Sequence, residues 1–361
     1  MSRAFIVGAG AVTWGGLGLE PIAAAIAGDG KAFATEEPVP GAPVTVGRVG
    51  SIKDPASQAT YRRWGQVDTY SRYGYVAARL ALEQAGLAGD VERAGYGVFL
   101  GTAYGCMEEN QRFDKYRVED GVLRGASPLV FKGTVDNAPA GWIAVAWGLK
   151  GPNATFVSGD GAGAESLWAG LRQIAAGRAP GLLCGGVERF VDLHLVLRER
   201  EPRWQGAVLS EGAGVVLVED EESMTARGAT PLAEVLGVVR HRGSLVEGLR
   251  AVAGRLRIDL ADVGLISLAV PDQARLDEER EAFGATARGG SDGSALSGVA
   301  IVADKTALGE SHGAWGGLAL CAALVRLEDG RWGGRPVAVV QVKGEGNENF
   351  YVALRGPGNA E

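Results

Sequence analysis

The sequence predicts an α/β protein with mixed sheets. Short runs of aliphatic and β-branched residues alternate with longer segments of helical periodicity. In Ser71–Ala85, apolar side chains recur at i, i+3 and i+4 on one face, as in an amphipathic helix. Ala164–Ala176 and Gly316–Leu327 are more apolar, which is typical of helices buried inside a domain. Strands that alternate with helices of both kinds form layered α/β domains.

The strand candidates are short apolar runs that lie between these helical segments. They are Ala4–Val7, Gly97–Gly101, Ala154–Val157, Gly181–Cys184, Gly214–Val218, Leu265–Val270, Val299–Val302, Val337–Val342 and Tyr351–Leu354. We expect these runs to form the sheets, with the helices as layers against them.

A charged segment divides the chain into two halves. Glu219–Ala229 carries clustered charge and no sheet pattern, so it predicts a surface helix. Each half opens with a strand and later contains a helix that follows a glycine-rich turn. We therefore expect an N-terminal half over residues 1–225 and a C-terminal half over residues 226–361, although no residue-level repeat relates them.

Composition excludes several classes of protein. With 46% apolar residues the chain is not generally disordered, and its formal charge of −7 argues against binding to nucleic acid. The N-terminus has no signal-peptide pattern and no apolar run is long enough to span a bilayer, so we expect a soluble, cytoplasmic protein without membrane contact. The three cysteines and three histidines lack metal-ligand spacing, so we expect neither a metal site nor a cofactor.

A first candidate motif, Gly8–Gly10, follows the opening strand. A dinucleotide-binding turn needs a third glycine at position 13 and an acidic residue after the next strand. Position 13 is Thr and no such acid follows. A nicotinamide-dependent dehydrogenase is therefore a weak alternative.

A second motif, Val157–Gly163 (VSGDGAG), joins a strand to an apolar helix. A strand, a sharp turn of small residues and a helix together describe a nucleophile elbow, which exposes one side chain at the helix N-terminus. The side chain at the tip is Asp160. From the spacing alone, an ordinary N-cap aspartate is the better interpretation of this residue.

The stretch from Ser127 to Phe190 resembles the central block of the β-ketoacyl-acyl-carrier-protein synthases, the condensing enzymes of the thiolase superfamily. The resemblance rests on Asn137–Gly141 (NAPAG), Gly148–Pro152 (GLKGP) and Gly185–Glu188 (GGVE). Further matches, which extend it over nearly the whole chain, begin at Asp68, Ser210 and Lys305. The resemblance implies a thiolase-like fold, in which two related halves form a layered α-β-α-β-α sandwich.

Members of this family condense acyl chains with a Cys nucleophile, two His and a supporting Lys. Carried over position by position, the nucleophile falls on Asp160, the first His on Ala269 and the second His on Glu310. Only Lys305 is retained. The resemblance therefore implies that the catalytic positions are vacated and that this chain has no catalytic residues of its own.

These replacements remove the condensing chemistry. A carboxylate is a poor acyl acceptor, because the mixed anhydride is high in energy. Ala269 cannot donate a hydrogen bond, and an ionised Glu310 would repel a developing enolate. Cys106 lies off the elbow and His312 lies two residues past the second His position, so we expect neither to substitute. At the family's glycine-rich gate, Glu345 replaces an aromatic residue.

A protein that keeps this scaffold without its nucleophile resembles the chain-length-factor subunits of type II polyketide synthases. Such a subunit forms a heterodimer with an active ketosynthase and shapes the tunnel for the growing acyl chain. Many chain-length factors carry Gln at the elbow, whereas this chain carries Asp160. The short length fits a system that makes polyene or fatty-acid-like chains.

The tunnel is expected in the segment Gly101–Tyr116, where the family places chain-gating residues. The candidates, at helical spacing, are Met107, Asn110, Phe113 and Tyr116. Ordinary core or interface packing is an equally good interpretation of these side chains.

The vacated site itself carries two acids and one base. Because unpaired carboxylates are costly in an apolar cavity, we expect Lys305 to contact Asp160, Glu310 or both, as an ion pair or a triad.

Two further questions stay open at the level of sequence. The alternative to a non-catalytic subunit is a homodimeric decarboxylase or hydrolase that uses Asp160 or Glu310 as a base.

An acidic carrier protein would need a basic docking surface. The candidates are Arg62, Arg63 and Arg72, and Arg198, Arg200 and Arg203, although such clusters are more often solvated surface. We expect the carrier protein to dock mainly on the active partner.

Overall fold

The computed structural model describes residues 3–39, 41–198, 206–289, 297–328, 330 and 334–357. The helices are α1 Glu20–Ala27, α2 Pro55–Thr60, α3 Thr69–Gln84, α4 Met107–Glu119, α5 Pro128–Phe131, α6 Ala138–Trp147, α7 Ala162–Ala175, α8 Asp192–Arg198, α9 Glu221–Ala226, α10 Leu245–Leu256, α11 Gln273–Gly289, α12 Lys305–Leu308 and α13 Trp315–Glu328. Short 3-10 turns are η1 Trp64–Gln66, η2 Gly159–Gly161, η4 Leu260–Asp262 and η5 His312–Ala314. None of the described helices is long and apolar enough to cross a membrane.

The strands are β1 Ala4–Thr13, β2 Gly16–Leu17, β3 Ala34–Val39, β4 Ala42–Gly47, β5 Gly97–Thr102, β6 Asn153–Val157, β7 Gly181–Glu188, β8 Leu209–Ser210, β9 Gly212–Asp220, β10 Ala233–Arg242, β11 Val263–Ser267, β12 Ala300–Val302, β13 Val337–Lys343 and β14 Glu348–Arg355. Among the described residues, eleven strands join in one sheet of order β12-β11-β13-β14-β10-β1-β9-β7-β5-β6, with β2 beside β1. Strands β3, β4 and β8 form a separate three-stranded sheet.

The large sheet consists of two halves with the same strand order. Numbered within each half, both run 3-2-4-5-1: β6-β5-β7-β9-β1 in the first half and β12-β11-β13-β14-β10 in the second. The halves meet where Ala4–Ile6 of β1 pairs with Ala233–Val235 of β10. The structure thus shows a repeated topology that the residues alone do not reveal. The expected division at residue 225 falls within α9, and we propose it as the boundary between the halves.

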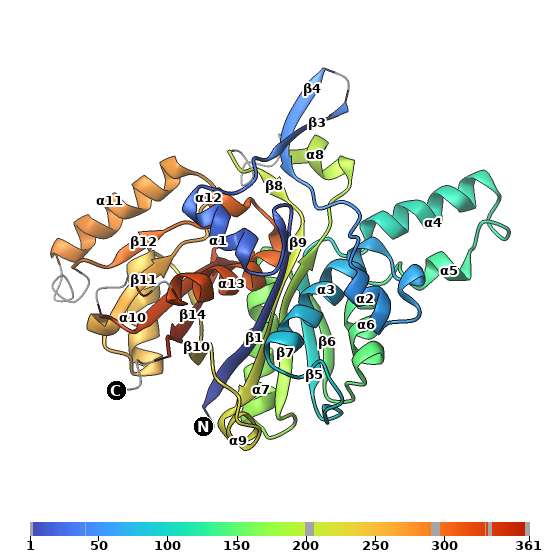
Figure 1. Ribbon diagram of the computed structural model, residues 1–361. Coiled ribbons are helices and arrows are strands. Elements are labelled where there is room, and N and C mark those ends of the chain that lie inside the picture. Colours follow the sequence, from blue (N-terminus) through green and yellow to red (C-terminus); the bar gives the residue numbers. More distant parts are fainter. Residues whose placement is uncertain are drawn as a thin grey trace.

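Helices cover the two halves of the sheet in layers (Figure 1). Helices α7 and α13 pack against each other and against strands of both halves, so they form the middle layer. Helices α3 and α6 cover the outer face of the first half, and α10 with α11 covers that of the second. This is the expected layered α-β-α-β-α arrangement. The apolar character of α13 follows from burial of Trp315–Leu324 on all sides, whereas α7 buries one face and exposes residues such as Arg172.

The middle helices approach each other through glycine. A Cβ atom on Gly163 would lie 2.8 Å from the carbonyl oxygen of Gly313, and one on Gly316 would lie 2.3 Å from the amide nitrogen of Ala164. A larger residue at either position would force the two helices apart. Because α7 and α13 begin at this contact, it also fixes the turns that precede them, and these turns carry the candidate site.

The Gly8–Gly10 motif is not a phosphate-binding turn. Strand β1 runs straight through it to Thr13. A Cβ atom on Gly8 would lie 2.1 Å from the carbonyl oxygen of Ala81, and one on Gly10 equally close to that of Ala77. The two glycines therefore let α3 pack directly on the strand, and the dehydrogenase alternative is wrong.

All the expected strands and helices are present, with shifts at their ends. Strands β2, β8 and β10, the β3–β4 hairpin and several helices, including α6, α10 and α11, were not predicted. Strand β10 departs from regular alternation because its pairing with β14 shifts between Val235 and Gly237. The surface helix expected over Glu219–Ala229 is confirmed as the shorter α9, since Glu219 and Asp220 still belong to β9.

Candidate functional site

The elbow lies between β6 and α7. Gly159 has a φ of 73°, a left-handed conformation that glycine adopts without strain, and it turns the chain sharply at the end of the strand. Asp160 follows at the tip, on η2. Helix α7 has Gly161 at its N-cap without a side-chain cap, so the N-cap interpretation of Asp160 is wrong. The elbow geometry predicted from the small residues is confirmed.

The Asp160 carboxylate is bonded to a buried histidine from the other half of the chain. Its Oδ1 lies 2.9 Å from Nδ1 of His312, whose side chain is 2% exposed. Burial lowers the pKa of His312, but the hydrogen bond to Asp160 and the negative charges of Glu310 and Glu188 outweigh it, so the pKa is raised above 6.5. The contact with Asp160 thus favours the positively charged form of the His312 ring.

A second ion pair lies beside the first. The Lys305 ammonium lies 2.9 and 2.8 Å from the two carboxylate oxygens of Glu310, and both side chains are buried. Glu310 Oε1 also accepts the backbone N–H of His312 at 3.1 Å, which joins the two pairs. The expected contact between Lys305 and a carboxylate is confirmed. Asp160 is not a third member of this pair, because His312 holds it instead.

Ala269, another position that the resemblance indicated, lies just beyond the end of β11. It is 2% exposed and its backbone N–H points to Oε1 of Gln341 at 3.4 Å. Its methyl group faces the same cavity as Asp160, Lys305 and Glu310. This cavity has a volume of about 1060 Å³. The structure therefore brings together all four positions that the resemblance indicated.

Glu345 lies over the elbow turn. It belongs to the loop Gly344–Asn347 between β13 and β14, and a Cβ atom on Gly159 would lie only 2.3 Å from its Oε1. Glu345 borders both the cavity in front of Asp160 and a neighbouring hollow of about 420 Å³ that includes Val157. The residue thus stands where the predicted gate should be, and its gating role remains a prediction.

Glu188, the last residue of β7, is a buried acid that sequence reasoning did not single out. Its side chain is fully buried and accepts the backbone N–H groups of Ala103 at 2.7 Å, Tyr104 at 3.2 Å and Gly313 at 3.2 Å. Burial raises its pKa to about 7, although the charge of His312 opposes the shift. The only sequence signal was its place at the end of the GGVE match.

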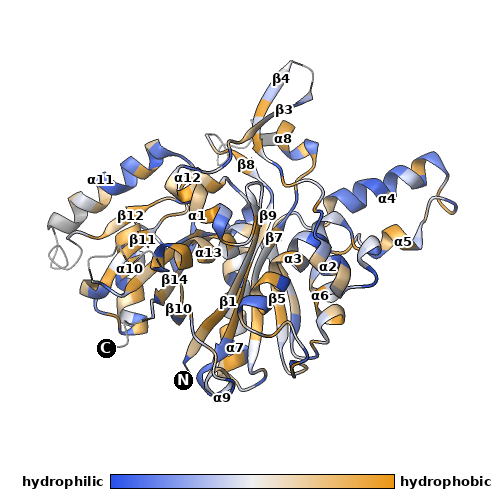
Figure 2. Ribbon diagram, viewed as in Figure 1, coloured by the Kyte–Doolittle hydropathy of each residue, from blue (hydrophilic) through white to orange (hydrophobic). Residues whose placement is uncertain are grey.

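The tunnel candidates lie elsewhere. Helix α4 projects from the body as an arm (Figure 1) and is hydrophilic along most of its length (Figure 2). The four candidates, all half-buried on this arm, are Met107, Asn110, Phe113 and Tyr116. The Phe113 ring packs 5.8 Å from that of Phe131 on α5. None of the four lines the cavity in front of Asp160. Their tunnel role remains a prediction about an assembled complex.

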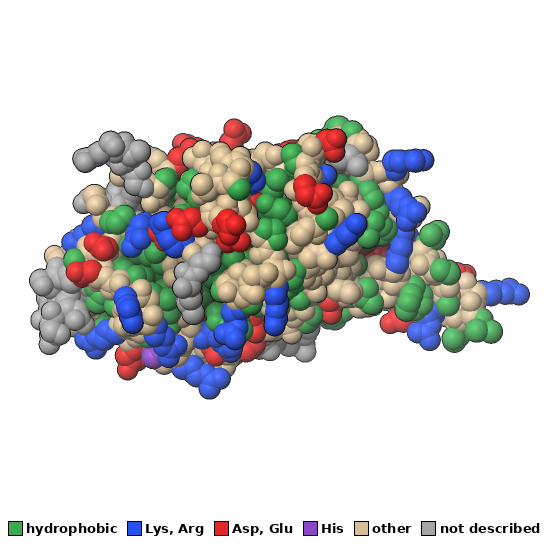
Figure 3. All heavy atoms as spheres, turned by 90° about the horizontal axis from the view of Figure 1, so that it is seen from below, with side chains coloured by type: hydrophobic (Ala, Val, Ile, Leu, Met, Phe, Trp, Pro, Cys, Tyr) green, Lys and Arg blue, Asp and Glu red, His purple; other side chains and the backbone are tan. Residues whose placement is uncertain are grey.

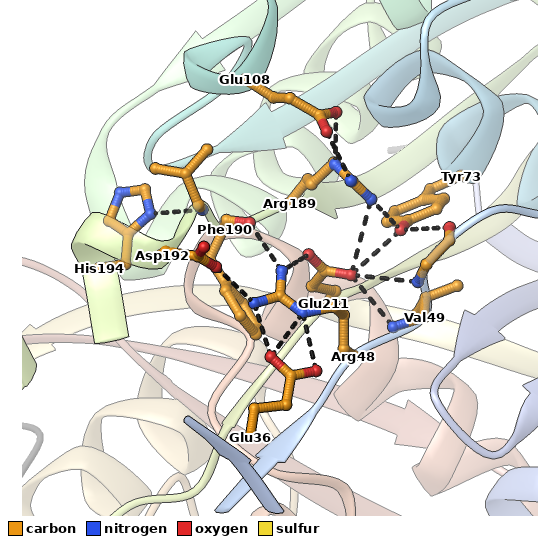
Figure 4. A network of polar contacts seen from close by, with 12 residues as sticks. Glu36, Arg48, Val49, Tyr73, Glu108, Arg189, Phe190, Asp192, His194 and Glu211 are labelled. Atoms are coloured by element: carbon orange, nitrogen blue, oxygen red, sulfur yellow. Dashed lines mark hydrogen bonds and ion pairs between the residues drawn. The ribbon is translucent and has the colours of Figure 1, made fainter. Parts of the chain in front are cut away.

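A buried ionic network fixes the base of this arm (Figure 4). The largely buried Arg189 pairs with Glu108, in the first turn of α4, at 2.6 Å. It also donates to the Tyr73 hydroxyl at 2.6 Å. The completely buried Glu211 accepts from Tyr73 at 3.1 Å and pairs with Arg48 at 3.4 Å. The network therefore ties α4 to α3 and to the segment after β4.

Cys106 is not a replacement nucleophile. Its sulfur contacts Asp136 Oδ1 at 3.2 Å and accepts from the Asn110 amide at 3.3 Å. Burial and the neighbouring carboxylate raise the pKa of the thiol to about 12, so almost no thiolate forms near neutral pH. Across the described ranges, no group of three or more His, Cys, Asp or Glu side chains is arranged to hold a metal ion.

The basic dock candidates divide into two sets. Arg62 and Arg63 are exposed before α3, and Arg72 stacks on Trp64 at 5.3 Å. Arg72 also lines a hollow of about 290 Å³ together with Arg112 and Lys132. In the second set, Arg200 and Arg203 lie outside the described residues, and Arg198 is described only as the last residue of α8.

Comparison with known proteins places the chain in the β-ketoacyl synthase family, because the model of the "Beta-ketoacyl synthase, N-terminal domain" matches residues 29–223. The 3-oxoacyl-acyl-carrier-protein synthase 2 of Vibrio cholerae is 31% identical over 192 residues, which are 48% of this chain and 46% of that protein. The same-named protein of Staphylococcus aureus strain N315 is 28% identical over 206 residues, 52% of this chain and 49% of the relative. The chain thus spans about half the length of the curated relatives it matches.

Solved structures show the same fold over nearly the whole chain. A β-ketoacyl synthase from Burkholderia phymatum STM815 superposes with a TM-score of 0.81 at 19% identity, over 99% of this chain and 100% of the other. The ishigamide ketosynthase/chain length factor superposes with a TM-score of 0.80 at 21% identity, over the same shares of both chains. The thiolase-like fold inferred from the resemblance is confirmed.

Proposed function

We propose that this chain is a non-catalytic, chain-length-factor-like subunit that pairs with an active ketosynthase and helps to shape the path of the growing acyl chain. The observation that carries the proposal is the 2.9 Å bond between Asp160 and His312 at the elbow. Where a condensing enzyme presents a free thiolate, this chain presents a carboxylate bound to a buried cation.

The rest of the cavity supports the same conclusion. Decarboxylative condensation needs hydrogen-bond donors aimed at a developing oxyanion. Ala269 supplies a methyl group there, and Glu310 is an acceptor whose two oxygens are both bonded to Lys305. Lys305, the cation beside Glu310, is therefore already engaged by an adjacent acid. Neither Ala269 nor Glu310 thus supplies a side-chain donor for an enolate.

The first half also offers a surface for a partner of the same fold. Strand β6 ends the sheet, and among the described residues it pairs only with β5. Exposed apolar side chains lie on β6, on the neighbouring α6 and on α5, namely Val157, Val145, Leu129 and Phe131. On the projecting arm, apolar side chains are interspersed with basic ones (Figure 3). An uncovered strand edge beside an apolar patch is a site for protein association. A partner seated there would cover the arm that carries the tunnel candidates.

Carrier-protein binding fits the same assembly. The chain's net charge is negative, so an acidic carrier protein would meet repulsion except at local basic surfaces such as Arg62, Arg63 and Arg72. We propose that the carrier protein docks mainly on the active partner, where the acyl chain is transferred.

A stand-alone decarboxylase or hydrolase remains the second candidate. It would use Asp160 or Glu310 as a general base, and the open cavity in front of both residues favours it. Against it, both carboxylates are already engaged, Asp160 with His312 and Glu310 with Lys305, so a substrate or a water molecule would compete with these contacts.

Co-purification tests the assembly. The chain is expressed alone and beside the neighbouring ketosynthase, and both samples are analysed by size-exclusion chromatography with light scattering. A one-to-one heterodimer is expected, with higher soluble yield than for the chain alone. Val157→Asp at the sheet edge should abolish the heterodimer, whereas Val91→Asp, at an exposed site before β5, should not. A soluble homodimer that does not bind the ketosynthase would support the stand-alone enzyme.

A further inference from the structure

His312 stands at the junction of the two halves. It follows α12 and begins η5 with a φ of 46°, a left-handed conformation that costs energy in a non-glycine residue. This backbone turns the imidazole toward the elbow of the first half, where Nδ1 meets Asp160. A strained backbone conformation persists in a folded protein only where surrounding contacts stabilise it. For His312, the bond to Asp160 is such a contact.

The ring is packed between other polar groups. The Tyr104 ring meets the His312 ring edge-on at 5.1 Å and also packs against the His194 ring at 4.4 Å. His194 Nδ1 accepts the backbone N–H of Val191, and burial, aided by the charge of His312, lowers the pKa of His194 to about 4. The pKa values of the two histidines are thus shifted in opposite directions, and His194 is neutral near pH 7.

The acids that act on His312 come from three parts of the chain: Asp160 lies on η2, Glu188 at the end of β7 and Glu310 in the preceding loop. Lys305 on α12 pairs with Glu310 in the same cluster. Three carboxylates against one ammonium would leave an excess of two negative charges in a buried cluster. Such an excess is strongly unfavourable in a low-dielectric interior. A positively charged imidazole reduces it, and the protonated form of Glu188 removes the remainder.

We propose that His312 is an internal counter-ion that holds the elbow carboxylate against the second half of the chain and so forms a pH-dependent lock at this site. The ring donates its Nδ1 proton to Asp160, and the His312 backbone N–H fixes Glu310 against Lys305. His312 is thus a positioning residue. This inference concerns the chain alone and does not depend on the proposed pairing with a ketosynthase.

The lock weakens at alkaline pH. A histidine whose folded pKa is raised contributes stability that is fully present below the unfolded value of 6.5 and is lost as the pH rises through the folded value. Above the folded pKa of His312, Asp160 faces a neutral ring. The electrostatic attraction between the elbow and the η5 turn is then lost. The effect is confined to these two turns, because α7 and α13 are otherwise packed in the apolar core.

Histidine ring NMR tests the proposal directly on the unmodified protein. The chain has three histidines, so His312 is identified by elimination with His194→Gln and His241→Gln. Expected is a doubly protonated His312 ring at about pH 6, which loses its proton only above 6.5. Asp160→Asn should lower the midpoint of this titration. A neutral His312 ring at about pH 6, or a midpoint unchanged by Asp160→Asn, would overturn the proposal.

A stability series provides the second readout. His312→Gln should lower the melting temperature most below pH 6.5, and its difference from the unmodified protein should narrow as the pH rises. His194→Gln removes a neighbouring histidine that is neutral in this range, so its effect should not vary with pH. A His312→Gln effect that is equal at all pH values would show that the ring acts by packing alone. Loss of partner binding would not bear on either measurement, since both use the isolated chain.

Discussion

Glu188 and Arg189 are adjacent in the chain, yet they belong to two different polar clusters. Glu188 accepts N–H groups from the turns beside the elbow, whereas Arg189 binds Glu108 at the base of α4. The end of β7 therefore links the vacated site to the arm that carries the tunnel candidates. The predictions below separate these two clusters.

Restoring the nucleophile alone should not restore catalysis. In Asp160→Cys, Ala269 still lacks a donor and Glu310 still presents a carboxylate, so the thiol lacks support for both decarboxylation and condensation. We expect no elongation of malonyl-carrier protein by this variant without a partner. The measurement is product mass spectrometry. Elongation by Asp160→Cys on its own would show that Ala269 and Glu310 do not prevent condensation.

Removing one member of the Lys305–Glu310 pair should lower the free energy of unfolding far more than replacing both members with apolar residues. Both side chains are buried, so Lys305→Met leaves a buried carboxylate unpaired and should destabilise the fold by about 3 kcal/mol. The double variant Lys305→Met with Glu310→Leu should recover most of this loss, because no charge remains. Chemical denaturation measures both. An equal loss in the two variants would mean that packing, not charge, dominates.

Arg189 should hold α4 in place. Arg189→Met leaves Glu211 without one of its partners and releases Glu108, with an expected loss of about 2 kcal/mol. Hydrogen–deuterium exchange should rise across α4 more than in α7. The control Arg117→Met removes an exposed pair with Asp114 on the same helix and should cost less than about 0.5 kcal/mol. Equal exchange across α4 in the two variants would contradict the role of Arg189 in holding α4 in place.

Glu188 should make the fold less stable as the pH rises. Its folded pKa of about 7 lies above the usual 4.5, so the folded state binds more protons between these values and stability falls as the pH increases through them. The fall is on the order of 3 kcal/mol. Glu188→Gln should flatten the profile from pH 4.5 to 7, whereas Glu222→Gln on exposed α9 should not. A profile unchanged by Glu188→Gln would place the titration elsewhere.

The residues predicted the layered fold well, because periodicity and glycine-rich turns report directly on burial. They did not reveal the hairpin β3–β4, whose ATEEPV strand is polar and pairs outside the main sheet. They also concealed the repeat, since the two halves share strand order and not sequence.

The site was predicted in its positions and only partly in its bonds. Charge balance alone indicated that Lys305 would meet a carboxylate, and Glu310, five residues away, is that partner. The Asp160–His312 bond was missed because it spans the two halves and depends on the left-handed backbone at His312. A conformation of this kind in a non-glycine residue has no signal in the sequence.

The central claim is that this chain takes no acyl group and acts through its partner. The most direct test is intact-protein mass spectrometry of the co-purified pair after incubation with acyl- and malonyl-carrier protein. The account predicts an acyl adduct on the ketosynthase only, with the mass of this chain unchanged. An acyl adduct on this chain, or elongated product from this chain without the ketosynthase, would contradict it.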